Sequence, residues 1–230
     1  MPRFSLPKNA WQLVALVIAV IATLVARWNR ETPRGSGRPE VSEKRTGGAD
    51  STPPKSGSSR KDKPRGKGWE VLTNCELVED RTNDGDSFAL RAGGETVTFR
   101  LYFADCPEKY RHQYNGDRIA DQGAYFGGLS EEQTIATGVE AREFALSLLT
   151  RGPVTVETKW EEVYDSERYY AFVRVGDKDL AEALVSRGLA RIHTKGTARR
   201  DGTPERTQKD RLYQLEREAK SQRRGGWGKR

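Results

Sequence analysis

Cysteine and histidine are scarce in this chain, with two residues of each. Cys75 and Cys106 lie 31 positions apart, a spacing that matches no zinc motif, and only His112 and His193 could complete a metal site with them. The sequence therefore argues against a structural zinc site. Two thiols fit either one disulfide or two unpaired side chains, and the pattern does not decide between them.

Apolar residues are nearly missing from Asn29 to Gly68, where glycine, proline, serine, threonine and basic residues dominate. A segment that buries so little apolar surface cannot offset its conformational entropy, so we predict a disordered linker over residues 29–68. The formal charge of +7 also belongs here, because residues 27–68 carry +7 whereas residues 69–230 carry −2. Overall basicity is therefore no argument that the folded part binds nucleic acid.

A long apolar run occurs at one place, Ala10–Ala26, which contains no charged residue and has Trp11 and Trp28 near its ends. Its length is at the lower limit for a membrane-spanning helix, which needs about 17 to 25 residues. We expect residues 1–28 to form a membrane anchor or signal-anchor. The predicted localisation is a membrane-anchored protein whose folded domain lies outside the cytoplasm, and the alternative is a protein secreted after signal-peptide cleavage.

Residues 69–230 have the composition of one ordinary domain, and two separate cores are not expected. Apolar residues alternate most clearly over Val97–Phe103, which indicates a half-buried strand. Gly93-Gly94 suits a tight turn between this strand and another at Ser87–Leu90. Two later strands are predicted over residues 154–159 and 169–175.

Helices are indicated where apolar residues recur every three or four positions. The first helix runs from about Val139 to Gly152-Pro153, the second from a capping Asp179 to Gly188, and the third contains Leu212, Leu215 and Ala219. Five short strands with one helix after the third and further helices at the end is the element order of an oligonucleotide-binding (OB) barrel. The predicted fold is α+β, a five-stranded OB-fold β-barrel with about three helices, preceded by a single N-terminal hydrophobic helix and a disordered linker.

Three short stretches combine acidic residues with arginines, namely Asp84-Gly85-Asp86-Ser87, Phe99–Glu108 and Ser166–Ala171. In this order and spacing they resemble the staphylococcal nuclease (thermonuclease-like) family, and the resemblance extends over residues 70–228. A lone Asp-Gly-Asp is mostly a turn, so the specificity of the signal comes from the three stretches together. The folded domain, 69–230, is accordingly predicted to be a staphylococcal nuclease-like domain.

The resemblance implies a calcium-dependent nuclease whose substrate is DNA or RNA. It assigns the site residues position by position. The implied site consists of Asp86, Asp105 and the backbone carbonyl of Cys106 as Ca²⁺ ligands, Glu108 as the general base, and Arg100 and Arg168 as phosphate-binding catalytic residues.

These residue types suit the chemistry. A phosphodiester gains negative charge on its oxygens during attack, so a site needs fixed cations there and a base on the water side. Carboxylate and carbonyl oxygens favour Ca²⁺ or Mg²⁺, arginine presents a planar fork of donors, and Glu108 can take a proton from water. Two departures from the family pattern concern the neighbours, because Cys106 stands where threonine is usual and Ser166 replaces a tyrosine that helps to hold a phosphate.

Residues 109–138 form a connection longer than that of the family prototype, and we expect a long functional loop or a small subdomain. Its aromatic residues could stack on nucleic-acid bases or simply pack against the barrel, and the sequence leaves both open. They include Tyr110, His112, Tyr114, Tyr125 and Phe126.

The sequence thus predicts a monomeric, membrane-tethered nuclease that hydrolyses phosphodiester bonds of DNA or RNA by metal-assisted, in-line attack of water. The alternative is a non-catalytic nucleic-acid-binding or protein-interaction OB-fold module tethered to the membrane. The loss of any predicted site residue would have favoured the alternative, and all of them are present.

Overall fold

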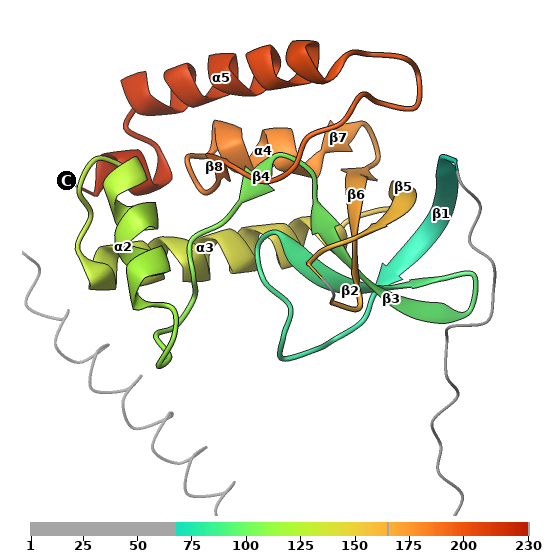
Figure 1. Ribbon diagram of the computed structural model, residues 1–230, viewed down its shortest axis with the longest axis horizontal. Coiled ribbons are helices and arrows are strands. Elements are labelled where there is room, and N and C mark those ends of the chain that lie inside the picture. The colour runs from blue at the N-terminus through green and yellow to red at the C-terminus, as the bar shows by residue number, and fades with distance from the viewer. Residues whose placement is uncertain (1–67, 165, 230) are drawn as a thin grey trace, which may run out of the picture. The chain divides into compact units, whose positions relative to one another are not determined.

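Five strands form a closed barrel in the computed structural model, which describes residues 68–164 and 166–229 (Figure 1). They are β1 (Glu70–Leu77), β2 (Ser87–Ala92), β3 (Glu95–Leu101), β5 (Val154–Glu162) and β6 (Arg168–Val175). The order β3-β2-β1-β5-β6 is antiparallel throughout, and a parallel pairing of β3 with β6 closes the ring. The predicted α+β barrel is confirmed, and its strand order is consistent with an OB fold.

The predicted hairpin joins β2 to β3. Ala92 pairs with Glu95, and both residues of the turn, Gly93 and Gly94, have positive φ angles of 56° and 87°. Such a turn matches the twist of the flanking strands. Glycine adopts the positive φ angles that it needs because glycine lacks a Cβ. Alternate side chains of the two strands then point into the barrel, where they are fully or almost fully buried, as at Phe88, Leu90, Phe99 and Leu101.

Short strands extend the barrel on two sides. β7 (Lys178–Asp179) pairs with β6, and β4 (Ala104–Asp105) pairs with β8 (Arg191–Ile192) in a separate two-stranded sheet. β4 follows β3 closely because the chain turns at Phe103, whose φ is 65°. The acidic residues after β3 are therefore placed beside a segment from late in the chain.

Four α-helices are present in the described part of the chain, whereas about three were predicted. They are α2 (Gly116–Tyr125), α3 (Glu131–Leu149), α4 (Leu180–Ser186) and α5 (Glu205–Ser221), followed by a short 3-10 helix, η2 (Gly225–Gly228). The additional helix, α2, lies in the 109–138 connection. Asp179 caps α4 as predicted, since its side chain accepts a hydrogen bond from the Glu182 backbone N–H at 3.0 Å.

The first α-helix of the prediction also begins earlier than expected, at Glu131 and not near Val139. Ser130 and Gln133 form a reciprocal capping box at its start. The buried residues of the early turns are Thr134, Thr137 and Gly138, which are small or polar. Buried apolar residues therefore recur at helical spacing only in the second half of the helix. The Ser130–Gln133 capping pattern, in contrast, was visible in the sequence and marks the true start.

Residues 109–138 form a small subdomain, not a bare loop, because α2 and the start of α3 occupy most of the segment. The turn between these helices buries Phe126 and Leu129 in a second hydrophobic cluster with Ala219 and Trp227 from the C-terminal part of the chain. Tyr110 and Tyr114, in contrast, are 58% and 85% exposed. Packing thus accounts for Phe126, while the stacking hypothesis stays open for the two exposed tyrosines.

The predicted membrane localisation is corrected here. Within residues 68–164 and 166–229, no helix is both long and apolar enough to cross a membrane. The longest, α3, has 19 residues and carries charged side chains in its first turn and beyond. The anchor predicted over residues 1–28, on which secretion also depended, lies outside the described residues, as does the linker predicted over 29–68 apart from its last residue.

Candidate active site

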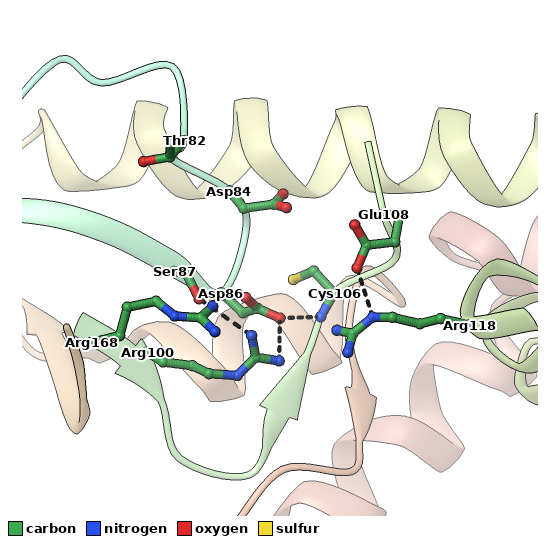
Figure 2. Close-up of a pocket in the computed structure, with 9 residues that line it drawn as sticks. All are labelled: Thr82, Asp84, Asp86, Ser87, Arg100, Cys106, Glu108, Arg118 and Arg168. Carbon is green, nitrogen blue, oxygen red and sulfur yellow. Dashed lines mark hydrogen bonds and ion pairs between the residues drawn. The ribbon is translucent and has the colours of Figure 1, made fainter. Parts of the chain in front are cut away.

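A pocket of about 240 Å³ opens where the turn before β2, strand β3, the segment after β4 and the start of β6 meet (Figure 2). Its wall combines acidic and basic side chains with hydroxyl groups. The lining residues are Thr82, Asp84, Asp86, Ser87, Arg100, Cys106, Glu108, Arg118 and Arg168. The structure therefore brings together most of the predicted site residues, although they come from separate stretches of sequence.

Barrel closure explains this convergence. Ser87 on β2 is the register partner of Arg100 on β3, and Arg100 is in turn the partner of Tyr170 on β6. Asp86 is held next to this row because its carbonyl accepts a hydrogen bond from the Leu101 backbone N–H at 2.9 Å. The parallel contact of β3 with β6 also places Arg168, at the first position of β6, beside the pocket.

Asp86 is almost completely buried, with 4% of its surface exposed. Its Oδ2 accepts hydrogen bonds from the Cys106 backbone N–H at 2.8 Å and from Arg100 Nη2 at 3.3 Å, and its Oδ1 accepts one from Ser87 Oγ at 3.0 Å. Burial raises the pKa of Asp86, and the Arg100 charge offsets this only in part.

Asp84, two residues earlier, adds a second acid to the same turn. Burial and the nearby Asp86 charge raise the pKa of Asp84 to about 6. Both carboxyl groups are thus disfavoured as anions, mainly because they are buried and in addition because other carboxylates are near. A cation placed here would stabilise the two anions.

Asp105 has the opposite surroundings. It is 1% exposed, and its Oδ1 lies 2.6 Å from Arg100 Nη2 and 2.7 Å from Arg118 Nη2, while its Oδ2 lies 2.6 Å from Arg191 Nε. Burial alone would raise the pKa of Asp105, but the charges of Arg118, Arg191 and Arg100 lower it. Both carboxylate oxygens are thus engaged by guanidinium groups, and Asp105 is not among the residues that line the pocket.

A buried glutamine fixes the backbone between Asp105 and Glu108. Gln122 on α2 is fully buried, its Nε2 donates to the Cys106 carbonyl at 3.0 Å, and its Oε1 accepts from the Glu108 N–H at 3.0 Å. Nε2 also lies 3.3 Å from Asp105 Oδ2. The carbonyl predicted to bind calcium therefore already has one protein partner.

Glu108 reaches the pocket with its side chain 23% exposed. Its Oε1 lies 2.6 Å from Arg118 Nε, the contact drawn in Figure 2. In the described residues no hydrogen bond or ion pair is found for its second oxygen, Oε2. Glu108 is thus held through one oxygen and keeps the other available to a water molecule.

Arg168 is the pocket cation with the least compensation. Its Nε donates to Ser166 Oγ at 3.2 Å, and across residues 68–164 and 166–229 no carboxylate lies within ion-pair distance of it. Burial and the neighbouring Arg100 charge lower the pKa of Arg168, although arginine stays charged at any working pH. Ser166, which stands where the resemblance leads us to expect a tyrosine, therefore orients this arginine. Within the described residues Arg168 has no carboxylate partner that would compete with a bound anion.

The donor chemistry of the acidic wall fits a hard divalent cation. Asp84, Asp86 and Glu108 contribute carboxylate oxygens, which Ca²⁺ and Mg²⁺ prefer. In the part of the chain that the structure describes, no three such residues are already arranged as a metal cage. The fit thus depends on Asp84 and Asp86, which are disfavoured as anions. Asp105 does not contribute to it in this arrangement, because three guanidinium groups already engage its carboxylate.

The two cysteines are unpaired and buried. Cys75 lies on β1, and burial raises its pKa to about 11. Burial also raises the pKa of Cys106, whose thiol is surrounded by Asp86, Asp84 and Asp105. Neither thiol is suited to act as a nucleophile, because the thiolate form is disfavoured.

The fold and pocket define a class of protein, a small α+β barrel that presents carboxylates and arginines together at one opening, where the arginines suit an anionic ligand and the carboxylates a cation. Comparison with known proteins identifies the family. A family model described as staphylococcal nuclease homologue matches residues 98–229, more than half of the chain, and the chain belongs to that family. The matched range includes all the predicted site residues except Asp86, which lies 12 positions before its start at residue 98.

A relative has the same kind of domain. The chain is 28% identical over 149 residues to "Staphylococcal nuclease domain-containing protein 1" from Schizosaccharomyces pombe (strain 972 / ATCC 24843). The match covers 63% of this chain and 14% of that protein. Since the chain spans about one seventh of the relative's length, the activity and partners of the whole relative do not carry over directly.

Four residues of the site were not among the predicted site residues, namely Asp84, Arg118, Gln122 and Arg191. Asp84 belongs to the Asp84-Gly85-Asp86-Ser87 stretch, where only Asp86 was assigned a role. Arg118 and Gln122 are four positions apart, which places them on one face of a helix once α2 is recognised. Arg191 is the register partner of Asp105 across β4 and β8, and this pairing between distant segments left no local signal.

Proposed function

We propose that this chain is a calcium-dependent nuclease that hydrolyses phosphodiester bonds of DNA or RNA. The observation that carries the proposal is the meeting of three features in one pocket, taken over the described residues: an arginine without an ion pair, two aspartates disfavoured as anions by burial, and a glutamate with one oxygen outside any hydrogen bond or ion pair. Membership of the staphylococcal nuclease family supports it, since nucleic-acid chemistry is typical of that class.

The phosphate is bound by the two arginines. Arg168 is free to form a bidentate contact with phosphate oxygens. Arg100 is held by Asp86 and Asp105, so its direction is fixed before substrate arrives. Pre-oriented cations stabilise the charge that develops on the phosphate without reorganising during the reaction.

Glu108 acts as the general base. It accepts a proton from water at its carboxylate while the water oxygen forms a bond to phosphorus. The bond from phosphorus to the opposite ester oxygen breaks, and that oxygen leaves with the electron pair and takes a proton from solvent. Asp86, with Asp84 beside it and the Cys106 carbonyl close by, would hold the divalent cation. When bound, that cation supplies charge stabilisation at the phosphate and lowers the pKa of a nearby water. That Asp105 is itself a ligand stays a prediction.

The test is cleavage of single-stranded DNA and of RNA by the whole 230-residue chain, with Ca²⁺ or with excess chelator. We expect cleavage that depends on Ca²⁺ and falls by about 10²-fold or more in Glu108→Gln and in Arg168→Met. Glu143→Gln and Arg174→Met are matched controls, since both side chains are exposed and lie outside the pocket. Cleavage that is equal in all four variants would overturn the proposal.

A non-catalytic nucleic-acid-binding or protein-interaction module is the second candidate. The engagement of Asp105 by three arginines favours it, because a predicted metal ligand is already neutralised. This candidate predicts binding without cleavage under every metal condition. Filter binding of the same single-stranded DNA, measured beside the cleavage assay, separates the two.

A further inference from the structure

Arg118 is a pocket residue that comes from the 109–138 subdomain and not from the barrel motifs. It lies in the first half of α2, and its side chain is 42% exposed. Despite this exposure, it makes two short ion pairs, with Glu108 Oε1 at 2.6 Å and with Asp105 Oδ1 at 2.7 Å. One guanidinium therefore joins the proposed base to the most buried acid of the site.

These contacts continue into the phosphate-binding group. Asp105 Oδ1 also lies 2.6 Å from Arg100 Nη2. Arg100, Asp105, Arg118 and Glu108 thus form an unbroken chain of ion pairs, visible in part in Figure 2. This series of ion pairs sets the distance between Arg100, which binds the phosphate, and Glu108, which accepts the proton.

We propose that Arg118 is a positioning residue, which holds the Glu108 carboxylate in the pocket by tying it to Asp105. The inference rests on the proposed function, since it assigns a role relative to the general base. It makes the 109–138 subdomain a necessary part of the site.

The contacts favour positioning over direct phosphate binding. Arg118 already uses Nε for Glu108 and Nη2 for Asp105. It contacts only Oε1 of Glu108, so the other oxygen keeps its capacity to accept a proton. Arg168, in contrast, makes no ion pair among the described residues, and its only hydrogen bond is from Nε to Ser166 Oγ, so it has more donors left for a phosphate than Arg118 has.

The rest of α2 is built to keep Arg118 in place. Gln122, one turn later, is fully buried and hydrogen-bonds the backbone on both sides of Pro107. Ile119 between them is also buried, with 1% of its surface exposed. A catalytic group is held accurately when rigid secondary structure supports its neighbours, and α2 supplies such support to the side chain and to the backbone of Glu108.

The experiment compares Arg118→Met and Arg118→Lys with Arg111→Met in the full chain, alone and combined with Glu108→Gln. Arg111 is a matched control, because it forms an exposed ion pair with Glu131 at 2.7 Å and does not line the pocket. We expect Arg118→Met to lower kcat by about 10- to 100-fold with little change in KM, because a small misplacement of a catalytic group has such an effect. Arg118→Lys should recover part of the loss, and Arg111→Met should match wild type.

In the Glu108→Gln background, Arg118→Met should cause no further loss, because its effect passes through Glu108. A raised KM with unchanged kcat, or a full additional loss in that background, would overturn the inference. The variant should fold, since Asp105 keeps Arg100 and Arg191. A crystal structure of Arg118→Met gives a readout apart from activity, with the Glu108 carboxylate expected to leave its position; an unmoved carboxylate contradicts positioning.

The two proposals fail in different ways. If Glu108→Gln cleaves as well as wild type, the proposed mechanism is wrong. If Glu108→Gln is inactive while Arg118→Met has the wild-type kcat, only the positioning role is wrong. If no variant cleaves, the crystal structure still decides whether Arg118 holds Glu108.

Discussion

Two acidic parts of the site differ in how their charge is balanced. At the turn before β2, Asp84 and Asp86 have one guanidinium, that of Arg100, within ion-pair distance among the described residues, and burial raises the pKa of both. At β4, Asp105 is contacted by three guanidiniums and its pKa is lowered. A bound cation would therefore stabilise the anions of Asp84 and Asp86, whereas the three guanidiniums already stabilise the anion of Asp105.

The difference follows from where the arginines originate. Arg100 belongs to the barrel and serves both acidic parts. Arg118 comes from the 109–138 subdomain and Arg191 from β8, and both contact Asp105. Elements around the barrel thus supply two of the three arginines that contact Asp105. Within the described part of the chain they supply none to Asp84 and Asp86, so a cation can still be bound at the turn before β2.

The largest effect is expected when the β4 acid loses its charge. Arg100 and Arg191 are nearly buried, at 8% and 6% exposed. Asp105→Asn leaves Arg191 without its ion pair and Arg100 with Asp86 alone. Removing one partner of a buried ion pair typically costs about 3–5 kcal/mol of unfolding free energy. Urea unfolding in the presence of chelator measures the loss. A loss as small as that of an exposed substitution, such as Asp177→Asn, would show that Asp105 does not organise the arginines.

At the turn before β2, replacing an acid is expected to raise the unfolding free energy and not to lower it. Asp84 has a pKa of about 6 in the folded protein, above its ordinary value of 3.8, so the folded state binds the proton more tightly than the unfolded state. Raising the pH from about 4 to 6 therefore lowers the contribution of Asp84 to the unfolding free energy.

Asp84→Asn removes that penalty. The variant should match wild type near pH 3.5 and exceed it above pH 6 by no more than about 3 kcal/mol, the equivalent of the pKa difference. Urea unfolding across this pH range, without divalent cations, gives the comparison. A difference that is constant with pH would mean that Asp84 is not strained as an anion.

The elements with local signals were predictable. The β2–β3 hairpin was marked by alternation and by Gly93-Gly94, and α4 by its capping Asp179. The start of α3 was missed because Thr134 and Thr137, and not apolar residues, face the protein there. An apolar period cannot reveal a helix face that packs through small polar side chains.

The site was predictable only as far as the motifs reach. Asp86, Arg100, Glu108 and Arg168 meet in the pocket as expected. The surroundings of Asp105 were not predictable, because they depend on tertiary contacts with α2 and β8. Sequence identified which residues carry charge, but the balance of those charges is a property of the folded chain.

Calcium should distinguish the two acidic parts. If Asp84 and Asp86 form the cation site, Ca²⁺ at 100 times its dissociation constant should raise the unfolding free energy of the wild type by about 2.7 kcal/mol. The effect should be much reduced in Asp86→Asn and retained in Asp105→Asn. The measurement is thermal or urea unfolding with a calcium titration. Loss of the calcium effect in folded Asp105→Asn alone would assign the ligand role to Asp105, as the family resemblance implies.

The smallest stability effect, and the most local, is expected at Gly138 on α3. A Cβ there would collide with the backbone carbonyl oxygens of Pro107 and Glu108, so Gly138→Ala must displace the segment that carries the base. Overpacking of this kind typically costs about 1–3 kcal/mol, whereas cleavage should fall much further because Glu108 moves relative to Arg100. Gly152→Ala is the matched control, since its Cβ would meet only Val175 Cγ1, at 3.8 Å. If Gly138→Ala lowered stability but kept full kcat, the close packing of α3 against the acidic segment would be structural, and the geometry between Glu108 and the arginines would not limit the reaction.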